Sequence, residues 1–125
     1  MNAADILKDK IILVVDDEPD VTDTVEDLLD MCMVRKANDF DTARQYLMSY
    51  SFDIVVLDIT MPEMNGLEAM KRIFAFDPDA RIIICSAIGQ QNLIVDAINS
   101  GIKDFIVKPF KPERLLSAIN KALKE

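Results

Sequence analysis

Residues 11–20 read IILVVDDEPD, and this stretch decides how the rest of the chain is interpreted. Its five apolar residues favour a β-strand, because four of them are β-branched and pack well on a pleated surface. A run that does not alternate with polar residues is typical of a parallel strand covered on both faces. The acids that follow stand before Pro19, and both acids and proline are favoured in the first turn of a helix. The stretch therefore predicts a buried strand followed at once by a helix.

The same succession of short apolar runs and amphipathic stretches continues along the chain, as in βαβ units around a parallel sheet. We expect strands at residues 11–16, 33–37, 53–58, 81–86 and 104–108. No glycine or proline separates the run at 33–37 from the helix before it, so that connection is unusually short.

Five groups of apolar residues at helical spacing predict the helices. The groups are Val21, Val25, Leu28 and Leu29; Phe40, Ala43 and Leu47; Leu67, Met70 and Phe74; Ile94, Ala97 and Ile98; and Leu115, Leu116, Ile119, Ala122 and Leu123. Pro112 stands at a helix start, and Gly101 at a helix end where a left-handed residue is needed. The result is a doubly wound (βα)5 α/β domain, flavodoxin-like, with a parallel five-stranded sheet in the order 2-1-3-4-5.

Composition narrows the possible functions. A chain of 125 residues is the size of one domain with its own core. Its net charge of −8, without a dense basic run, would repel a polyanion, so nucleic acid is not an expected partner. No apolar run reaches the length of a bilayer span and no signal peptide is evident, so we expect no membrane insertion and a cytoplasmic location. The two cysteines have no CxxC spacing and the chain has no histidine, which argues against thiolate metal sites.

Polar residues gather where the predicted strands end. The first strand ends in Asp16 and Asp17, the third in Asp58, the fourth in Ser86 and the fifth in Lys108. Ligands of open parallel sheets bind at this edge. Each residue alone has an ordinary explanation, such as a helix N-terminus, a turn or a solvated surface charge. Their coincidence at one edge points to a site.

The chemistry of these groups indicates a cation. Crowded carboxylates repel one another unless a cation lies among them. Oxygen ligands without histidine or cysteine select a hard ion, and Mg2+ suits a half-open site that also receives phosphate oxygens. A carboxylate beside the metal is a nucleophile for phosphorus, while Lys108 and Ser86 are suited to contact the phosphoryl oxygens.

At these residues the chain resembles the response-regulator receiver domains of two-component systems (CheY-like). The segments ILVVDDEPD, DIVVLDITMPEMNG, CSAIGQ and GIKDFIVKPF stand in family order. The resemblance covers residues 10–125, and residues 1–9 would then be an N-terminal extension. From Asp58 onward the chain is most similar to chemotaxis response regulators, whereas the first half resembles a more generic receiver. This unevenness suggests the hypothesis of an engineered or chimeric chain.

The resemblance implies a role for each site residue. Asp58 would be the phosphoacceptor, and Asp58, Asp17 and the backbone carbonyl of Thr60 would bind Mg2+ directly, with Asp16 binding through water. Lys108 would contact the phosphoryl oxygens. The remaining two implied roles belong to the switch residues, Ser86 and Phe105, although Phe105 is equally well explained as a core aromatic. The family also has a cis peptide bond at the position of Lys108 and Pro109.

The resemblance implies phosphoryl transfer from a sensor histidine kinase to Asp58. A protein output partner would bind the face formed by the fourth helix, the fifth strand and the fifth helix. Such a phosphoprotein is a response regulator of a phosphorelay and not an enzyme with turnover as its purpose, although it assists its own phosphorylation and dephosphorylation. Two alternatives stay open at this point. One is a receiver-like scaffold without a signalling role, and the other is a haloacid-dehalogenase-type (HAD-type) phosphatase, which would need a second acid at Thr60.

Overall fold

The computed structural model describes residues 7–61 and 64–124. Its centre is a five-stranded sheet with the order β2-β1-β3-β6-β7, in which all neighbours are parallel. This is the predicted flavodoxin-like order, because the short strands β4 and β5 lie outside the sheet. Every predicted strand is confirmed to within one residue at either end. The strands are β1 (Ile11–Val15), β2 (Met33–Ala37), β3 (Ile54–Asp58), β6 (Ile82–Ser86) and β7 (Asp104–Val107).

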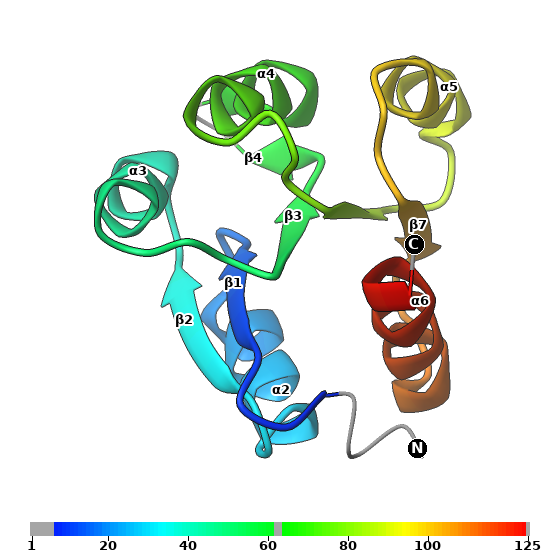
Figure 1. Cartoon of the computed structure of the whole chain (residues 1–125). Coiled ribbons are helices and arrows are strands. Elements are labelled where there is room, and N and C mark those ends of the chain that lie inside the picture. The colour runs from blue at the N-terminus through cyan, green and yellow to red at the C-terminus, as the bar shows by residue number, and fades with distance from the viewer. Residues whose placement is uncertain (1–6, 62–63, 125) are drawn as a thin grey trace.

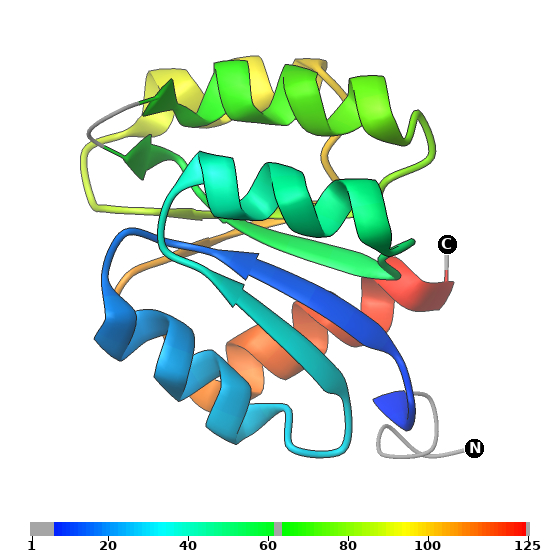
Figure 2. The ribbon, with the colours of Figure 1, turned by 90° about the vertical axis from the view of Figure 1, so that its left-hand side faces the viewer.

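Helices cover both faces of this sheet. Figure 1 shows α3, α4 and α5 on one face and α2 and α6 on the other, and the view in Figure 2 agrees. The helices are α2 (Pro19–Leu28), α3 (Phe40–Ser49), α4 (Gly66–Phe76), α5 (Gln91–Asn99) and α6 (Pro112–Lys124). Helix α5 ends before Gly101, which has the left-handed φ of +104° that the sequence predicts.

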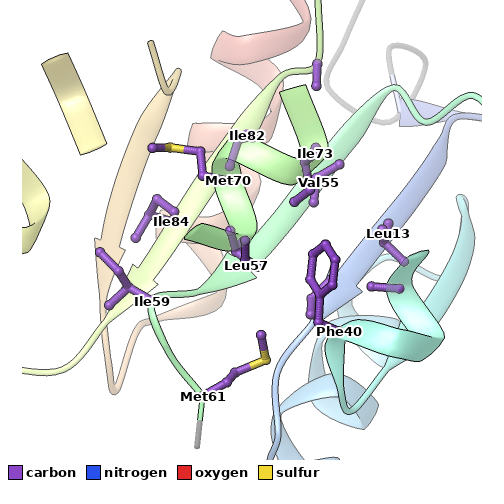
Figure 3. Close-up of a cluster of buried hydrophobic side chains, with 14 of the residues drawn as sticks. Leu13, Phe40, Val55, Leu57, Ile59, Met61, Met70, Ile73, Ile82 and Ile84 are labelled. Atoms are coloured by element: carbon purple, nitrogen blue, oxygen red, sulfur yellow. The ribbon is translucent and has the colours of Figure 1, made fainter. Parts of the chain in front are cut away.

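The two helical layers divide the core because successive strand residues point to opposite faces. Leu13, Leu57 and Ile84 pack with helices α3, α4 and α5, and Figure 3 shows these three side chains in that cluster. Their strand neighbours pack with α2 and α6 instead. Every residue of β3 and β6 is therefore buried, and so are all residues of β1 except Ile11, which is partly exposed.

Two local features differ from the sequence predictions. The chain after β3 forms a small antiparallel hairpin of β4 (Thr60–Met61) and β5 (Met64–Asn65), which was not predicted. Ile98, predicted to face the sheet, is 50% exposed on α5, while Ile94 and Ala97 of the same group are buried as predicted. One helix face covers only a limited arc, and Ile98 lies outside the arc that Ile94 and Ala97 occupy.

The chain before β1 also contributes to the core. Leu7 is only 1% exposed and belongs to the cluster beneath α2 and α6. Its carbonyl accepts a hydrogen bond from the Cys32 thiol at 3.2 Å. The predicted boundary between residues 9 and 10 remains a prediction, and residues 1–6 and 125 lie outside the described part of the chain. Within that described part, no helix has the length and apolar character needed to span a membrane.

Candidate functional site

Three buried polar side chains lie at the carboxyl ends of adjacent strands. Asp16 follows β1 and is 2% exposed, Asp58 ends β3 and is 3% exposed, and Ser86 ends β6 and is fully buried. These strand ends lie on one edge of the sheet, at the left in Figure 2. In the strand order β2-β1-β3-β6-β7, the chain connections change direction at one point, which lies between β1 and β3. Ligands of doubly wound folds bind at that point, so the structure brings the predicted residues to the expected place.

Lys108 connects the carboxylates of this edge. Its Nζ lies 2.7 Å from Asp16 Oδ2, 3.7 Å from Asp58 Oδ2 and 3.7 Å from Glu18 Oε1. Burial acts to lower the pKa of Lys108, but the hydrogen bond that its ammonium donates to Asp16 and the charges of Asp16 and Asp58 raise it overall. The lysine is therefore a fixed positive charge that serves several carboxylates at once.

The acids after β1 form a compact cluster. Carboxylate oxygens of Asp16, Asp17 and Glu18 all lie within 4.8 Å of one another. Asp16 Oδ1 accepts a hydrogen bond of 2.9 Å from the Glu18 amide, which turns the chain back toward the edge. Glu18 was not predicted as a site residue, because an acid before a proline is fully explained as the start of a helix. Its side chain is 63% exposed, so it lies at the open side of the cluster.

Ser86 has an unused hydroxyl. Its Oγ is buried, and among the residues that the structure describes it has no hydrogen-bond partner. A buried polar atom without a partner costs free energy, and one explanation is a ligand that is not part of the protein. The Lys108 amide donates to the Ser86 carbonyl at 2.7 Å, so the two residues lie side by side. Phe105, on the neighbouring strand β7, is partly buried and packs against the core.

The segment after Asp58 is held in place by a close contact with α4. The Gly66 amide donates to the Ile59 carbonyl at 2.7 Å. A Cβ atom on Gly66 would lie 2.4 Å from the Ile59 Cα, so only glycine fits at this position. Thr60 follows directly, and its backbone pairs with Asn65 in the β4–β5 hairpin. The predicted role of the Thr60 carbonyl as a metal ligand stays a prediction.

Neither cysteine is suited to act as a nucleophile. Burial raises the pKa of Cys85 to about 12, with Lys108 acting in the opposite direction. Burial also raises the pKa of Cys32, assisted by the negative charges of Asp30 and Asp53. Since the thiolate is the reactive form, both thiols stay inert at neutral pH. Cys85 is the small buried core residue that the sequence indicated.

The available ligand atoms suit a hard cation. Asp16, Asp17 and Glu18 offer only carboxylate oxygens, and these are the ligands that Mg2+ and Ca2+ prefer. The Lys108 ammonium, in contact with these carboxylates, and the unused Ser86 hydroxyl are hydrogen-bond donors at the same edge. A site that holds both carboxylates and donors can receive a phosphoryl group once a cation offsets the carboxylate charge.

The fold and the site together define a flavodoxin-like α/β domain with a cluster of acidic side chains at its topological switch point. Comparison with known proteins identifies its family, because the model for the response regulator receiver domain matches residues 12–120. The chain thus belongs to the response regulator receiver domain family, and it is a receiver domain of the two-component kind. The Lys108–Pro109 peptide bond is cis, as in that family.

Individual relatives are similar to most or part of the chain. Chemotaxis protein CheY of Thermotoga maritima is 44% identical over 118 residues, which is 92% of this chain and 98% of the relative. Chemotaxis protein CheY of Listeria monocytogenes is 64% identical over 72 residues, or 58% of this chain and 60% of the relative. The crystal structure of the receiver domain of NtrX from Brucella abortus has a TM-score of 0.86 at 35% identity, with 90% of this chain and 98% of that one covered.

These matches identify a signalling protein rather than a classical enzyme. They do not favour the HAD-type phosphatase. They also do not favour the scaffold alternative, since the relative from Thermotoga maritima aligns from one half of the chain into the other. The higher identity over a shorter stretch in Listeria agrees with an uneven similarity along the chain.

Proposed function

We propose that Asp58 accepts a phosphoryl group from a phosphohistidine of a sensor histidine kinase. The observation that carries this proposal is the position of the Asp58 carboxylate. The side chain is only 4% exposed at the end of β3, and its carboxylate lies 3.7 Å from the Lys108 ammonium. The similarity to chemotaxis proteins supports the same role. The receiver domain would extend over residues 10–125, and the cytoplasmic location expected from the sequence is part of the proposal.

Mg2+ is the proposed cofactor. Asp17, Asp58 and the Thr60 carbonyl would bind it directly and Asp16 through water, and Glu18 is close enough to contribute to the same acidic cluster. A bound Mg2+ ion would neutralise charge that develops on the phosphoryl oxygens during transfer. The arrangement explains why the fold retains acids whose mutual repulsion is only partly offset by Lys108.

The transfer uses residues of this chain in distinct ways. A carboxylate oxygen of Asp58 attacks phosphorus, and the O–P bond forms as the P–N bond to the donor imidazole breaks. Lys108 stays protonated and holds the negative phosphoryl oxygens beside Asp58. Later attack by water on the phosphorus of the acyl phosphate would break the O–P bond, release inorganic phosphate and return Asp58 to its carboxylate form. The domain assists both reactions without being an enzyme with turnover as its purpose.

The output of the signal would pass through Ser86 and Phe105. The unused Ser86 hydroxyl is free to donate to a phosphoryl oxygen, and Phe105 would change rotamer as the neighbouring backbone follows. The predicted output face corresponds to α5, β7 and α6. Exposed apolar residues on α5 and β7 support binding of a protein partner there; they are Val95, Ile98 and Val107.

Labelling of Asp58 tests this proposal. Wild type in millimolar Mg2+ should gain the mass of one phosphoryl group from acetyl phosphate, and beryllofluoride should bind to it. Asp58→Asn should show neither, and chelation of Mg2+ should abolish both in wild type. Intact-mass spectrometry and a beryllofluoride-dependent shift in melting temperature are the measurements. Equal labelling of wild type and Asp58→Asn would remove Asp58 from its role.

The variant also serves as its own folding control. Without Mg2+, Asp58→Asn should be at least as stable as wild type, because it removes one of the repelling carboxylates. A large loss of stability would show that the Asp58 carboxylate is structural. Labelling by acetyl phosphate would then be measured on variants of Lys108 and Ser86 instead.

A further inference from the structure

Thr22 is a buried polar residue that the site does not explain. The structure describes four buried polar or charged residues, and three of them are Asp16, Asp58 and Ser86. The fourth, Thr22, is 1% exposed and lies in the first turns of α2. Buried polar groups need hydrogen bonds, so the partners of Thr22 show what it is for.

The hydroxyl of Thr22 belongs to a chain of hydrogen bonds that closes the loop between β1 and α2. Asn38 follows β2, and its Nδ2 donates to the Asp16 carbonyl at 2.9 Å and to Thr22 Oγ1 at 3.2 Å. Thr22 Oγ1 donates in turn to the Pro19 carbonyl at 3.1 Å. We call residues 16–19 the acidic loop. Its first and last residues are thus joined through two side chains that lie outside it.

The orientation of the Asn38 amide is fixed by its partners. A backbone carbonyl only accepts hydrogen bonds, so the nitrogen of the Asn38 amide must face Asp16. The amide group has two hydrogens, and its nitrogen donates both to the Asp16 carbonyl at the start of the acidic loop and to the Thr22 hydroxyl. The Asp16 amide donates to the Ala37 carbonyl at 3.0 Å. The end of β2 therefore holds both peptide groups that flank the Asp16 side chain.

We propose that Asn38 and Thr22 are positioning residues that set the conformation of the acidic loop and thereby the affinity of the site for Mg2+. They do not touch the reacting atoms. The effect on Mg2+ rests on the proposed function, whereas the effect on the loop does not. Figure 2 shows the end of β2, the outermost strand, near the start of α2. A side chain that follows β2 can therefore reach the acidic loop.

The physical reason is preorganisation. We call the hydrogen bonds made by Asn38 and Thr22 the clasp. Without the clasp, the acidic loop must be ordered when the cation binds, and this ordering weakens the affinity. Loss of a partner that orients a metal ligand typically weakens affinity by roughly 10- to 100-fold. Here the contact acts through the main chain of Asp16 and Asn38 is solvent-exposed, so we expect about a threefold to tenfold weaker Mg2+ affinity.

Four variants separate positioning from a purely structural role. Thr22→Val removes the hydroxyl and keeps the shape of the side chain, whereas Thr22→Ser keeps the hydroxyl and loses a buried methyl group. Asn38→Ala removes both donated hydrogen bonds. Asn120→Ala is the matched control, because its Nδ2 donates to the Leu116 carbonyl within α6 at 3.0 Å and it lies outside the site.

The experiment measures Mg2+ affinity by calorimetric titration and amide hydrogen exchange in Mg2+-free protein. Asn38→Ala and Thr22→Val should bind Mg2+ about three to ten times more weakly than wild type. Thr22→Ser should keep the wild-type affinity although it melts at a lower temperature, and Asn120→Ala should keep it as well. The Glu18 amide, which donates to Asp16 Oδ1, should exchange faster in Asn38→Ala and Thr22→Val only.

Two outcomes distinguish a failure of the positioning role from a failure of the proposed function. Unchanged Mg2+ affinity and unchanged Glu18 exchange in Asn38→Ala and Thr22→Val would overturn the positioning role, while Mg2+ binding by wild type would leave the proposed function intact. If wild type binds no Mg2+, the proposed function fails together with the link to affinity. Faster exchange of the Glu18 amide in the two variants would then still establish that the clasp holds the loop.

Discussion

Ile84 in the body of the sheet and Asp58 at its carboxyl edge are almost equally removed from water, with 0% and 3% exposure. Burying an isoleucine side chain stabilises a fold by roughly 1.5–3 kcal/mol, whereas burying a carboxylate costs free energy unless the charge is paired. The same sheet thus contains a body whose burial stabilises the protein and an edge whose buried carboxylates cost free energy that pairing must offset. Stability and function are thus carried by different parts of the central strands.

The edge is only partly neutralised by the protein itself. Lys108 is the one cation that the described ion pairs place at Asp16, Asp58 and Glu18. In contrast, the strand residues of the body pack against apolar neighbours from both helical layers. Because body and edge differ in this way, substitutions in the body should change stability alone, and substitutions at the edge should change the response to a cation.

The largest effect on stability is expected from Ile82→Ala in the body. Ile82 is fully buried at the start of β6, at the opposite end of the strand from Ser86. Its truncation should lower the free energy of unfolding by about 2–5 kcal/mol, because a cavity is left behind. The Mg2+ affinity of the folded protein should stay within about twofold of wild type, because substitutions at distant positions without shared contacts act independently.

Denaturant unfolding and Mg2+ titration measure the two quantities. Ile82→Val is the matched control and should cost only about 0.5–1.5 kcal/mol. If the Mg2+ affinity of Ile82→Ala fell in step with its stability, body and edge would act as one unit and the division between them would be wrong.

An intermediate effect is expected from Lys108→Met at the edge. The variant leaves Asp16 and Asp58 buried without their shared cation, and the remaining repulsion should lower stability by about 1–3 kcal/mol without Mg2+. Saturating Mg2+ should restore more stability to this variant than it adds to wild type, because the metal then supplies the missing positive charge. Melting temperatures with and without Mg2+ measure the difference. The division into body and edge would be wrong if Mg2+ left the variant as unstable as before.

The body was predictable from the sequence because its signal is repetitive. Apolar runs such as 54–57 and 82–85 define strands, and Pro19 and Pro112 mark the helix starts that the structure shows. Even the strand at 33–37, after a short connection, has the predicted bounds. Ile98 was assigned wrongly, because the spacing of apolar residues shows which residues share a helix face but not how wide the covered part of that face is.

The edge was predictable only in part. Asp16, Asp58, Ser86 and Lys108 could be brought together in advance because parallel strands end at one edge. The clasp of Asn38 and Thr22 could not, since a threonine in a helix and an asparagine after a strand are common for local reasons. The hairpin of β4 and β5 was missed because strands of two residues have no periodicity to detect.

The smallest effect is expected from Asp104, a carboxylate at the start of β7 that has a cation of its own. Arg114 Nη2 lies 3.2 Å from its Oδ1 and also donates to the Phe105 carbonyl at 2.7 Å. Burial acts to raise the pKa of Asp104, but the hydrogen bonds from Arg114 and from the Phe105 amide lower it below the ordinary value of 3.8. A lowered pKa means that the folded state favours the charged form, so the stabilisation is present above about pH 4 and is lost as the pH falls through the folded value.

Asp104→Asn should therefore be less stable than wild type by about 0.5 kcal/mol at pH 7, as expected for a mostly surface ion pair. The difference should shrink as the pH falls through the lowered pKa of Asp104, because the carboxyl then becomes protonated in wild type as well. Urea unfolding of both proteins at several pH values measures it, and the difference between them cancels the acid titration of all other groups. Mg2+ should leave this difference unchanged, because the charge of Asp104 is already paired. A dependence on Mg2+ would show that Asp104, at the start of β7, is coupled to the acids of the carboxyl edge, and the separation of edge and body would then not hold for this strand.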